Sequence, residues 1–180
     1  MPRMPSSTSA DRLDDESGEY KISPSPSVTS REWTQEDQHE FLKSVTGVFN
    51  ITSEAIEGEW PRMSQRLTIR FHVDEEQNKI WGRFDMGIVD GSILLNPSPG
   101  ELEHDTPMKF QWRGRQSETG SPEKGNGEVT ISENRTIRGV FHGMCGNIDF
   151  KGRRRLMPSG ISGQNVGFYR QSWEDYAPWW

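Results

Sequence analysis

"KIWGRFDMGIVDG", residues 79–91, decides the fold class of this chain, because its apolar and polar side chains alternate. Ile80 and Phe84 fall on one face, which is the period of two expected for a strand with a buried side. A similar stretch, "TIRGVFHGMCGNIDF", follows at residues 136–150 and shares the G-x-F core. A glycine on the inward face lets a sheet coil or leaves room for a large neighbour. Both stretches therefore predict strands of a strongly curved sheet.

The same alternation recurs between residues 47 and 155. It is clearest in "RLTIRFHV" (66–73) and "MKFQWRGR" (108–115), and about eight short segments share it. Consecutive strands joined by short polar turns predict an antiparallel meander. Eight strands can close into a small barrel, which also removes exposed edges. We therefore expect an all-β fold, a closed calycin-like barrel, with a two-sheet sandwich as the alternative.

Glycines and polar runs predict the connections between these strands. Polar, Gly- and Pro-rich runs at residues 96–107 and 116–127 indicate two longer loops. Glycine is the residue that most readily adopts the positive φ of tight turns. We expect such turns at Gly87, Gly91, Gly143 and Gly146.

Composition divides the chain into four segments. Residues 1–30 are rich in Ser, Pro, Asp and Glu, which predicts a disordered arm and accounts for an overall hydrophobic content of only 31%. Residues 31–46 predict a short helix with Thr34 as N-cap. Residues 47–155 form the barrel domain. Residues 156–180 form an aromatic-rich C-terminal tail with a short helical segment.

Charge and cysteine content narrow the classes of partner and cofactor. The net charge of −6 argues against nucleic acid as the partner, apart from the basic run "KGRRR" at residues 151–155. Three arginines at a strand end more often contact the protein's own acceptors. Cys145 is the only cysteine, so a disulfide within the chain and a cysteine-based zinc site are excluded. We expect no metal and no cofactor.

Targeting signals are also missing from the sequence. No apolar run approaches the ~18 residues needed to cross a bilayer, and the first residues have no apolar signal region. We therefore expect a cytoplasmic or nuclear protein that is neither secreted nor inserted in a membrane.

Catalytic patterns are weak. His142 and Cys145 lie close in sequence, but no nucleophile signature surrounds them. Asp85, Glu128 and Asp149 would become acid–base candidates only if the facing of their strands were inverted. No catalytic residue is assigned.

Several runs carry a family resemblance. "GVFNI", "LTIRF", "IWGRFDMGIVDG", "FQWRGR", "GNGEVTI", "IRGVF" and "IDFKGRR" resemble a family of small, uncharacterised fungal β-rich proteins, over roughly residues 45–155. That resemblance implies no activity and no catalytic residues. The expected topology is also similar to that of the calycin barrels, which comprise lipocalins, fatty-acid-binding proteins and avidins. This second likeness is architectural only, because the first strand has "GVF" where lipocalins have G-x-W.

Two functions are compatible with these features. The first is a non-enzymatic binding or interaction module, whose C-terminal tail contacts a protein partner, because Trp and Tyr dominate binding hot spots. The tail residues assigned to this role are Trp173, Tyr176, Trp179 and Trp180. The alternative is a barrel that holds a small apolar ligand, as a carrier or as a cyclase or isomerase. Its candidate pocket lining consists of Phe84, Phe110, Trp112 and Phe141, with Trp81 added from the other face of its strand.

Overall fold

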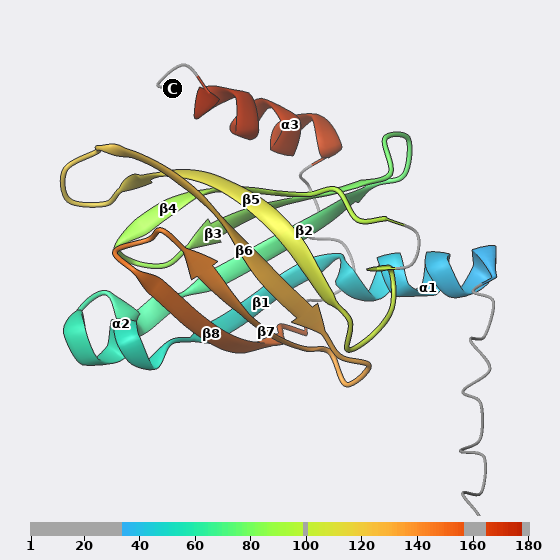
Figure 1. The fold of residues 1–180 in the computed structure, drawn as a ribbon, viewed down its shortest axis with the longest axis horizontal. Coiled ribbons are helices and arrows are strands. Elements are labelled where there is room, and N and C mark those ends of the chain that lie inside the picture. The colour runs from blue at the N-terminus through green and yellow to red at the C-terminus, as the bar shows by residue number, and fades with distance from the viewer. Residues whose placement is uncertain (1–33, 99–100, 157–164, 178–180) are drawn as a thin grey trace, which may run out of the picture. The chain divides into compact units, whose positions relative to one another are not determined.

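Eight antiparallel strands form a closed barrel in the computed structural model, which describes residues 34–98, 101–156 and 165–177 (Figure 1). Each strand pairs with the next, and the first pairs with the last through Ile51 and Gly152. The predicted meander and its closure are confirmed, which rules out the two-sheet sandwich. The arm expected at residues 1–30 lies outside the described residues. The strands are β1 (Gly47–Thr52), β2 (Thr68–Asp74), β3 (Lys79–Asp85), β4 (Val89–Leu95), β5 (Pro107–Gln116), β6 (Pro122–Ile131), β7 (Thr136–His142) and β8 (Asn147–Arg154).

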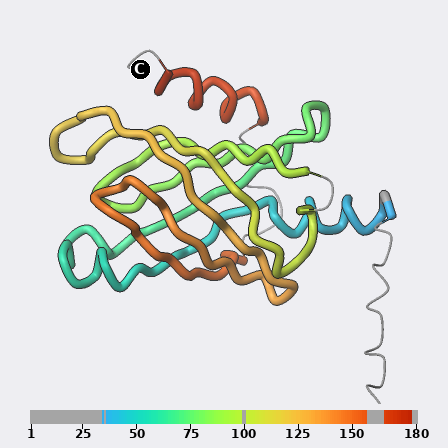
Figure 2. Tube along the Cα trace, in the orientation of Figure 1, coloured from blue at the N-terminus to red at the C-terminus, as the bar shows by residue number. Residues whose placement is uncertain are grey.

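Helices α1 (Gln35–Val45) and α2 (Glu54–Glu59) lie at opposite ends of the barrel (Figure 2). Phe41 of α1 and Ile56 of α2 are buried in the same core cluster as the inward side chains of the strands. Thr34 caps α1 as predicted, because its hydroxyl oxygen accepts from the Asp37 amide at 3.2 Å. Both ends of the barrel are thus covered. Helix α2 was not expected from the sequence, and neither was the short 3₁₀ helix η1 (Ser64–Arg66).

Aromatic side chains cover glycines on the neighbouring strands inside the barrel. Phe110 lies opposite Gly127 in the register of β5 and β6, and a Cβ added to Gly127 would collide with the Phe110 ring. Trp112 covers Gly125 in the same way, one repeat along the strands. The predicted use of inward glycines, which is to leave room for a large neighbour, is therefore confirmed. Two further pairs follow the pattern: Phe71 with Gly82, and Phe150 with Gly139.

Two expectations about connections are wrong. Gly91 lies inside β4, where the backbone of Arg113 and Gly114 in β5 approaches so closely that a Cβ would collide with it. A glycine that permits close backbone approach looks the same in sequence as a glycine that permits a turn. Residues 116–127 are mostly strand, because β5 continues to Gln116 and β6 begins at Pro122. The expected turns at Gly87, Gly143 and Gly146 are confirmed, with φ of 75°, 84° and 110°.

Helix α3 (Val166–Asp175) lies against the outer wall of the barrel, over β2 to β5 (Figure 1). Its Tyr169 and Trp173 form a small apolar cluster with Trp81 of β3, separate from the barrel core. Asn165 caps its first turn by accepting from the Phe168 amide at 3.1 Å. The expected short helical segment of the C-terminal tail is thus confirmed. None of the described helices is both long and apolar enough to span a bilayer.

Candidate functional site

The predicted pocket residues of the barrel interior pack against one another. The ring centroid of Phe141 lies 4.9 Å from that of Phe84, 5.0 Å from that of Phe110 and 6.2 Å from that of Trp112. Each of the four is at most 3% exposed. Trp112 is also fixed in place, because its Nε1 donates to the His142 carbonyl at 3.1 Å. These side chains fill the middle of the barrel.

Trp81, the fifth residue assigned to a pocket lining, lies on the outside of the barrel under α3. Its ring centroid is 6.2 Å from that of Trp173, in an edge-to-face arrangement. Its Nε1 donates to the Asp74 carboxylate at 3.0 Å. Trp81 therefore belongs to the surface on which α3 docks.

The aromatic side chains of the C-terminal tail also face this outer wall. Trp173 is 5% exposed, and the Arg113 guanidinium stacks on its ring at 4.2 Å. Tyr176 donates its hydroxyl proton to the Asp90 carboxylate at 3.0 Å. The other two tail residues, Trp179 and Trp180, lie outside the described residues.

The catalytic candidates do not assemble into a site. The three carboxylates that would be acid–base candidates in inverted strands, Asp85, Glu128 and Asp149, point outward and are exposed. The predicted facing of their strands is therefore correct. His142 Nδ1 lies 3.0 Å from the Asn147 amide oxygen, and Cys145 sits in the exposed turn between them. Partial burial raises the pKa of the Cys145 thiol, and nearby carboxylates raise it further, which disfavours the nucleophilic thiolate. Within the described ranges, no group of three or more His, Cys, Asp or Glu is arranged to hold a metal ion.

The basic run at residues 151–155 contacts the chain's own helices. Lys151 pairs with Glu54 of α2 at 3.2 Å, although both side chains are largely exposed. Arg154 donates from Nη1 to the Ser44 carbonyl at 3.3 Å, at the C-terminal end of α1. These contacts give two of the cations a structural role.

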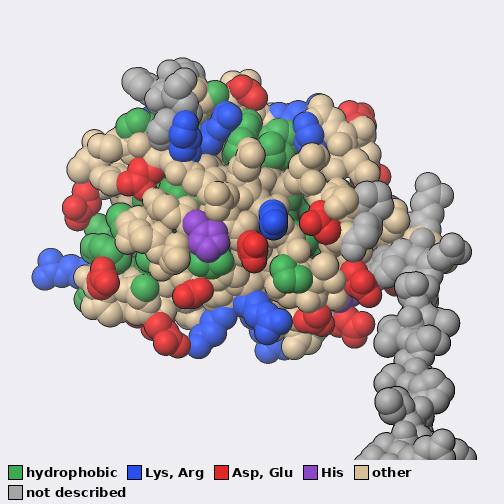
Figure 3. Space-filling model, in the orientation of Figure 1, with side chains coloured by type: hydrophobic (Ala, Val, Ile, Leu, Met, Phe, Trp, Pro, Cys, Tyr) green, Lys and Arg blue, Asp and Glu red, His purple; other side chains and the backbone are tan. Residues whose placement is uncertain are grey.

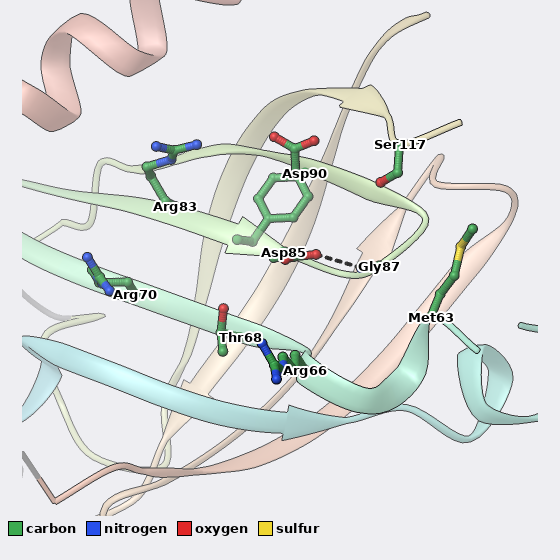
Figure 4. Close-up of a pocket in the computed structure, with 10 residues that line it drawn as sticks. Met63, Arg66, Thr68, Arg70, Arg83, Asp85, Gly87, Asp90 and Ser117 are labelled. Atoms are coloured by element: carbon green, nitrogen blue, oxygen red, sulfur yellow. Dashed lines mark hydrogen bonds between the residues drawn. The ribbon is translucent and has the colours of Figure 1, made fainter. Parts of the chain in front are cut away.

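A polar hollow of about 500 Å³ opens on the outer wall of the barrel, where η1, β2 and β3 meet (Figure 4). Arg66 enters it from η1, Arg70 from β2 and Arg83 from β3. Hydroxyl groups are added by Thr68 of β2 and by Ser117 from the turn after β5. We call it the arginine hollow, and its lining is completed by Met63, Phe84, Asp85, Gly87 and Asp90.

Strand geometry brings the arginines together. Thr68 and Arg70 are two residues apart, so both lie on the outward face of β2, and Arg66 ends η1 two residues before Thr68. Arg70 and Arg83 are direct cross-strand partners in the register of β2 and β3. Like charges placed directly opposite each other destabilise a sheet. The pairing of Arg70 with Arg83, beside Arg66, is therefore suited to an anionic ligand.

The carboxylates of the hollow are held by other groups. Asp85 accepts from the Gly87 amide at 2.8 Å, and Gly87 adopts a positive φ that allows this tight turn. Asp90 accepts from Tyr176, as described above. Among the described residues, Arg66 and Arg83 form no ion pair. Their charges are therefore available to the hollow.

Two further hollows lie on the same outer wall. One, of about 660 Å³, spans β3 to β7 and has Lys79, Lys109 and His142 in its lining. The other, of about 300 Å³, lies beside α3 and shares Arg83 with the arginine hollow. Cationic and anionic side chains are interspersed over the face seen in Figure 3. The arginine hollow is distinguished by its adjacent guanidinium groups.

The sequence reasoning did not identify this site. It placed Arg70 and Arg83 outward but gave them no role. A signal was available, because a hairpin that pairs Asp74 with Lys79 also pairs Arg70 with Arg83.

Comparisons of the chain with protein-family models, with curated proteins and with solved structures found no match. The resemblance to fungal β-rich proteins and to calycin barrels therefore stays a prediction.

Proposed function

We propose that this protein is a non-enzymatic binding module that holds a small anionic ligand in the arginine hollow. The observation that carries the proposal is the cross-strand pair of Arg70 and Arg83, with Arg66 beside it. Guanidinium groups gathered at one opening make the local potential more positive, which favours a bound anion.

The donors in the hollow favour carboxylate or phosphate groups. Guanidinium groups are planar and present paired N–H donors that match both groups in a bidentate manner. Thr68 and Ser117 add hydroxyl donors at the same opening. A hollow of about 500 Å³ is within the range of sites for small molecules.

Binding rather than turnover fits the carboxylates of the site. The Asp85 carboxylate accepts a hydrogen bond from the Gly87 amide, and the Asp90 carboxylate accepts one from the Tyr176 hydroxyl group, so both side chains already have structural roles. The alternative function, a carrier or isomerase with an apolar ligand inside the barrel, requires space that Phe84, Phe110, Trp112 and Phe141 occupy.

Calorimetric titration of the full chain tests the proposal. Citrate and inorganic phosphate are the two probes, and they distinguish carboxylate from phosphate preference. We expect at least one of them to bind, more weakly as salt is raised. Because hydrogen bonds to charged groups contribute about 1.5–3 kcal/mol, Arg83→Gln is expected to weaken binding about tenfold or more.

The matched control is Arg138→Gln, which removes an exposed outward arginine from β7. It is expected to leave the affinity nearly unchanged. The proposal is wrong if neither anion binds the full chain. It is also wrong if Arg83→Gln and Arg138→Gln weaken binding equally.

A further inference from the structure

Two side chains of α3 contact arginines of the hollow. The Tyr169 side chain is buried against the barrel, which raises the pKa of its hydroxyl group, and the nearby Arg70 guanidinium opposes that shift by its charge and by hydrogen bonding. The Phe168 ring lies over the Arg83 guanidinium, with 5.6 Å between its centroid and Cζ. Each contact uses only part of a guanidinium group, which has five N–H donors. Both arginines also line the hollow.

A third contact concerns the negative side of the hollow. Tyr176, at the C-terminal end of α3, donates its hydroxyl proton to Asp90 Oδ2 at 3.0 Å. A hydrogen bond donated to a carboxylate partly offsets the negative charge of that carboxylate. Without this bond, the Asp90 carboxylate would oppose an anion in the same opening more strongly.

We propose that α3 is part of the binding site, that Tyr169 and Tyr176 are its positioning residues, and that anion binding and α3 docking reinforce each other. The proposal rests on the arginine hollow being the ligand site. By linkage, if docked α3 raises the affinity for an anion, the anion stabilises docked α3 by the same factor. Ordering two guanidinium groups before binding also lowers the entropic cost of binding.

Other contacts that hold α3 lie away from the hollow. Arg170 bonds the Asp74 carboxylate at 2.6 Å, and the hydroxyl oxygens of Ser172 and Ser92 are 2.7 Å apart. None of these four residues lines the hollow. Helix α3 can therefore be loosened without changing any group that would touch the ligand.

The test compares anion affinity in four forms of the full chain. Citrate and phosphate are titrated into the wild type, Arg170→Ala, Tyr176→Phe and the control Glu174→Gln, whose side chain is exposed on α3. Arg170→Ala loosens the whole helix, whereas Tyr176→Phe removes only the hydroxyl group. Typical coupling free energies predict that both variants weaken binding at least about fivefold. Glu174→Gln should stay within about twofold of the wild type.

The fluorine magnetic resonance signal of Trp173, in protein labelled with fluorotryptophan, provides the reciprocal measurement, because the emission of the chain's seven tryptophans would overlap. Saturating citrate or phosphate should raise the temperature at which Trp173 becomes exposed in the wild type, and should raise it less in Tyr176→Phe. A purely structural role for α3 would lower that temperature in the variants without changing their affinity for the anion. Equal affinity of the wild type, Arg170→Ala and Tyr176→Phe would overturn the coupling and leave the proposed function standing. Absence of binding to the wild type would overturn both.

Discussion

Arg170 of α3 donates two hydrogen bonds to one oxygen of the Asp74 carboxylate, from Nε at 2.9 Å and from Nη2 at 2.6 Å. The Asp74 side chain is 1% exposed, and the same oxygen accepts from Trp81 Nε1 at 3.0 Å. Burial alone would raise the pKa of Asp74, but the hydrogen bonds from Arg170, Trp81 and the Gln77 amide outweigh it and lower the pKa. The buried carboxylate therefore ties the C-terminal helix to the hairpin of β2 and β3.

Replacing Asp74 by Ala should release α3 while the barrel remains folded. The substitution leaves the Trp81 indole N–H without its acceptor, which costs on the order of 2 kcal/mol of docking free energy. The fluorine signal of Trp173 in fluorotryptophan-labelled protein should move to its solvent-exposed position at a denaturant concentration that leaves the far-UV signal of the barrel unchanged. Glu76→Gln is the matched control, because Glu76 is 86% exposed and lies 3.5 Å from the same arginine. Simultaneous loss of both signals in Asp74→Ala would show that α3 and the barrel unfold as one unit.

Docking of α3 should weaken in two steps as the pH falls. His72 stacks on Tyr169 with 5.2 Å between ring centroids, and burial lowers its pKa below the ordinary 6.5 despite the nearby Asp74 charge. Docking of α3 therefore favours neutral His72. The docking stability that is present above pH 6.5 is lost as the pH falls from 6.5 to the lowered pKa of His72. The contribution of Asp74 is present above its ordinary pKa of 3.8 and is lost as the pH falls through its lowered value.

The same fluorine signal of Trp173, followed during denaturation at each pH, measures both steps. His72→Gln should abolish the first step and keep the second. Docking that grows stronger between pH 6.5 and 5 would contradict the assignment.

Adding a methyl group at Gly127 should strain the barrel wall. A Cβ there would collide with the Val140 carbonyl and with the Phe110 ring, so Gly127→Ala is expected to cost about 1–3 kcal/mol of unfolding free energy. Gly58→Ala in α2 is the control, because nothing lies within 4 Å of its added Cβ. Helix propensity predicts that Gly58→Ala is neutral or stabilising by up to about 1 kcal/mol. Urea denaturation measures both, and equal effects would contradict the close packing of aromatic side chains on glycines.

Truncating the central aromatic side chain should create the internal space that the wild type lacks around it. Phe141 is fully buried and contacts Phe84, Phe110, Trp112 and Phe150, so Phe141→Ala is expected to cost about 3–5 kcal/mol. An apolar cavity of this kind can bind benzene. Benzene should therefore raise the melting temperature of Phe141→Ala and not that of the wild type. Stabilisation of the wild type by benzene would instead favour the internal carrier.

Alternation of apolar and polar residues between residues 47 and 155 was sufficient to predict the strands and their inward faces. The inward aromatic side chains were assigned to a pocket lining, whereas Phe84, Phe110 and Trp112 pack on Phe141. Alternation did not predict the role of Gly91, because the close approach of the backbone at this residue depends on the neighbouring strand β5. The docking position of α3 was also missed, since outward polar residues such as Asp74 and Arg113 do not reveal which helix will cover them. Trp81 was the available clue, as a large apolar side chain on an otherwise polar face. The pairing of Arg70 with Arg83 required the register of the hairpin, which periodicity alone does not provide.

The central claim is that the ligand lies on the outer wall of a filled barrel, between the arginines of the hollow. Nuclear magnetic resonance titration of the full chain with citrate and phosphate tests it most directly. The account predicts that the Nε–H signals of Arg66, Arg70 and Arg83 shift and saturate together, while the methyl signals of the interior residues Ile69 and Ile93 stay in place. Saturating shifts of the interior methyl signals without shifts of these arginines would contradict it.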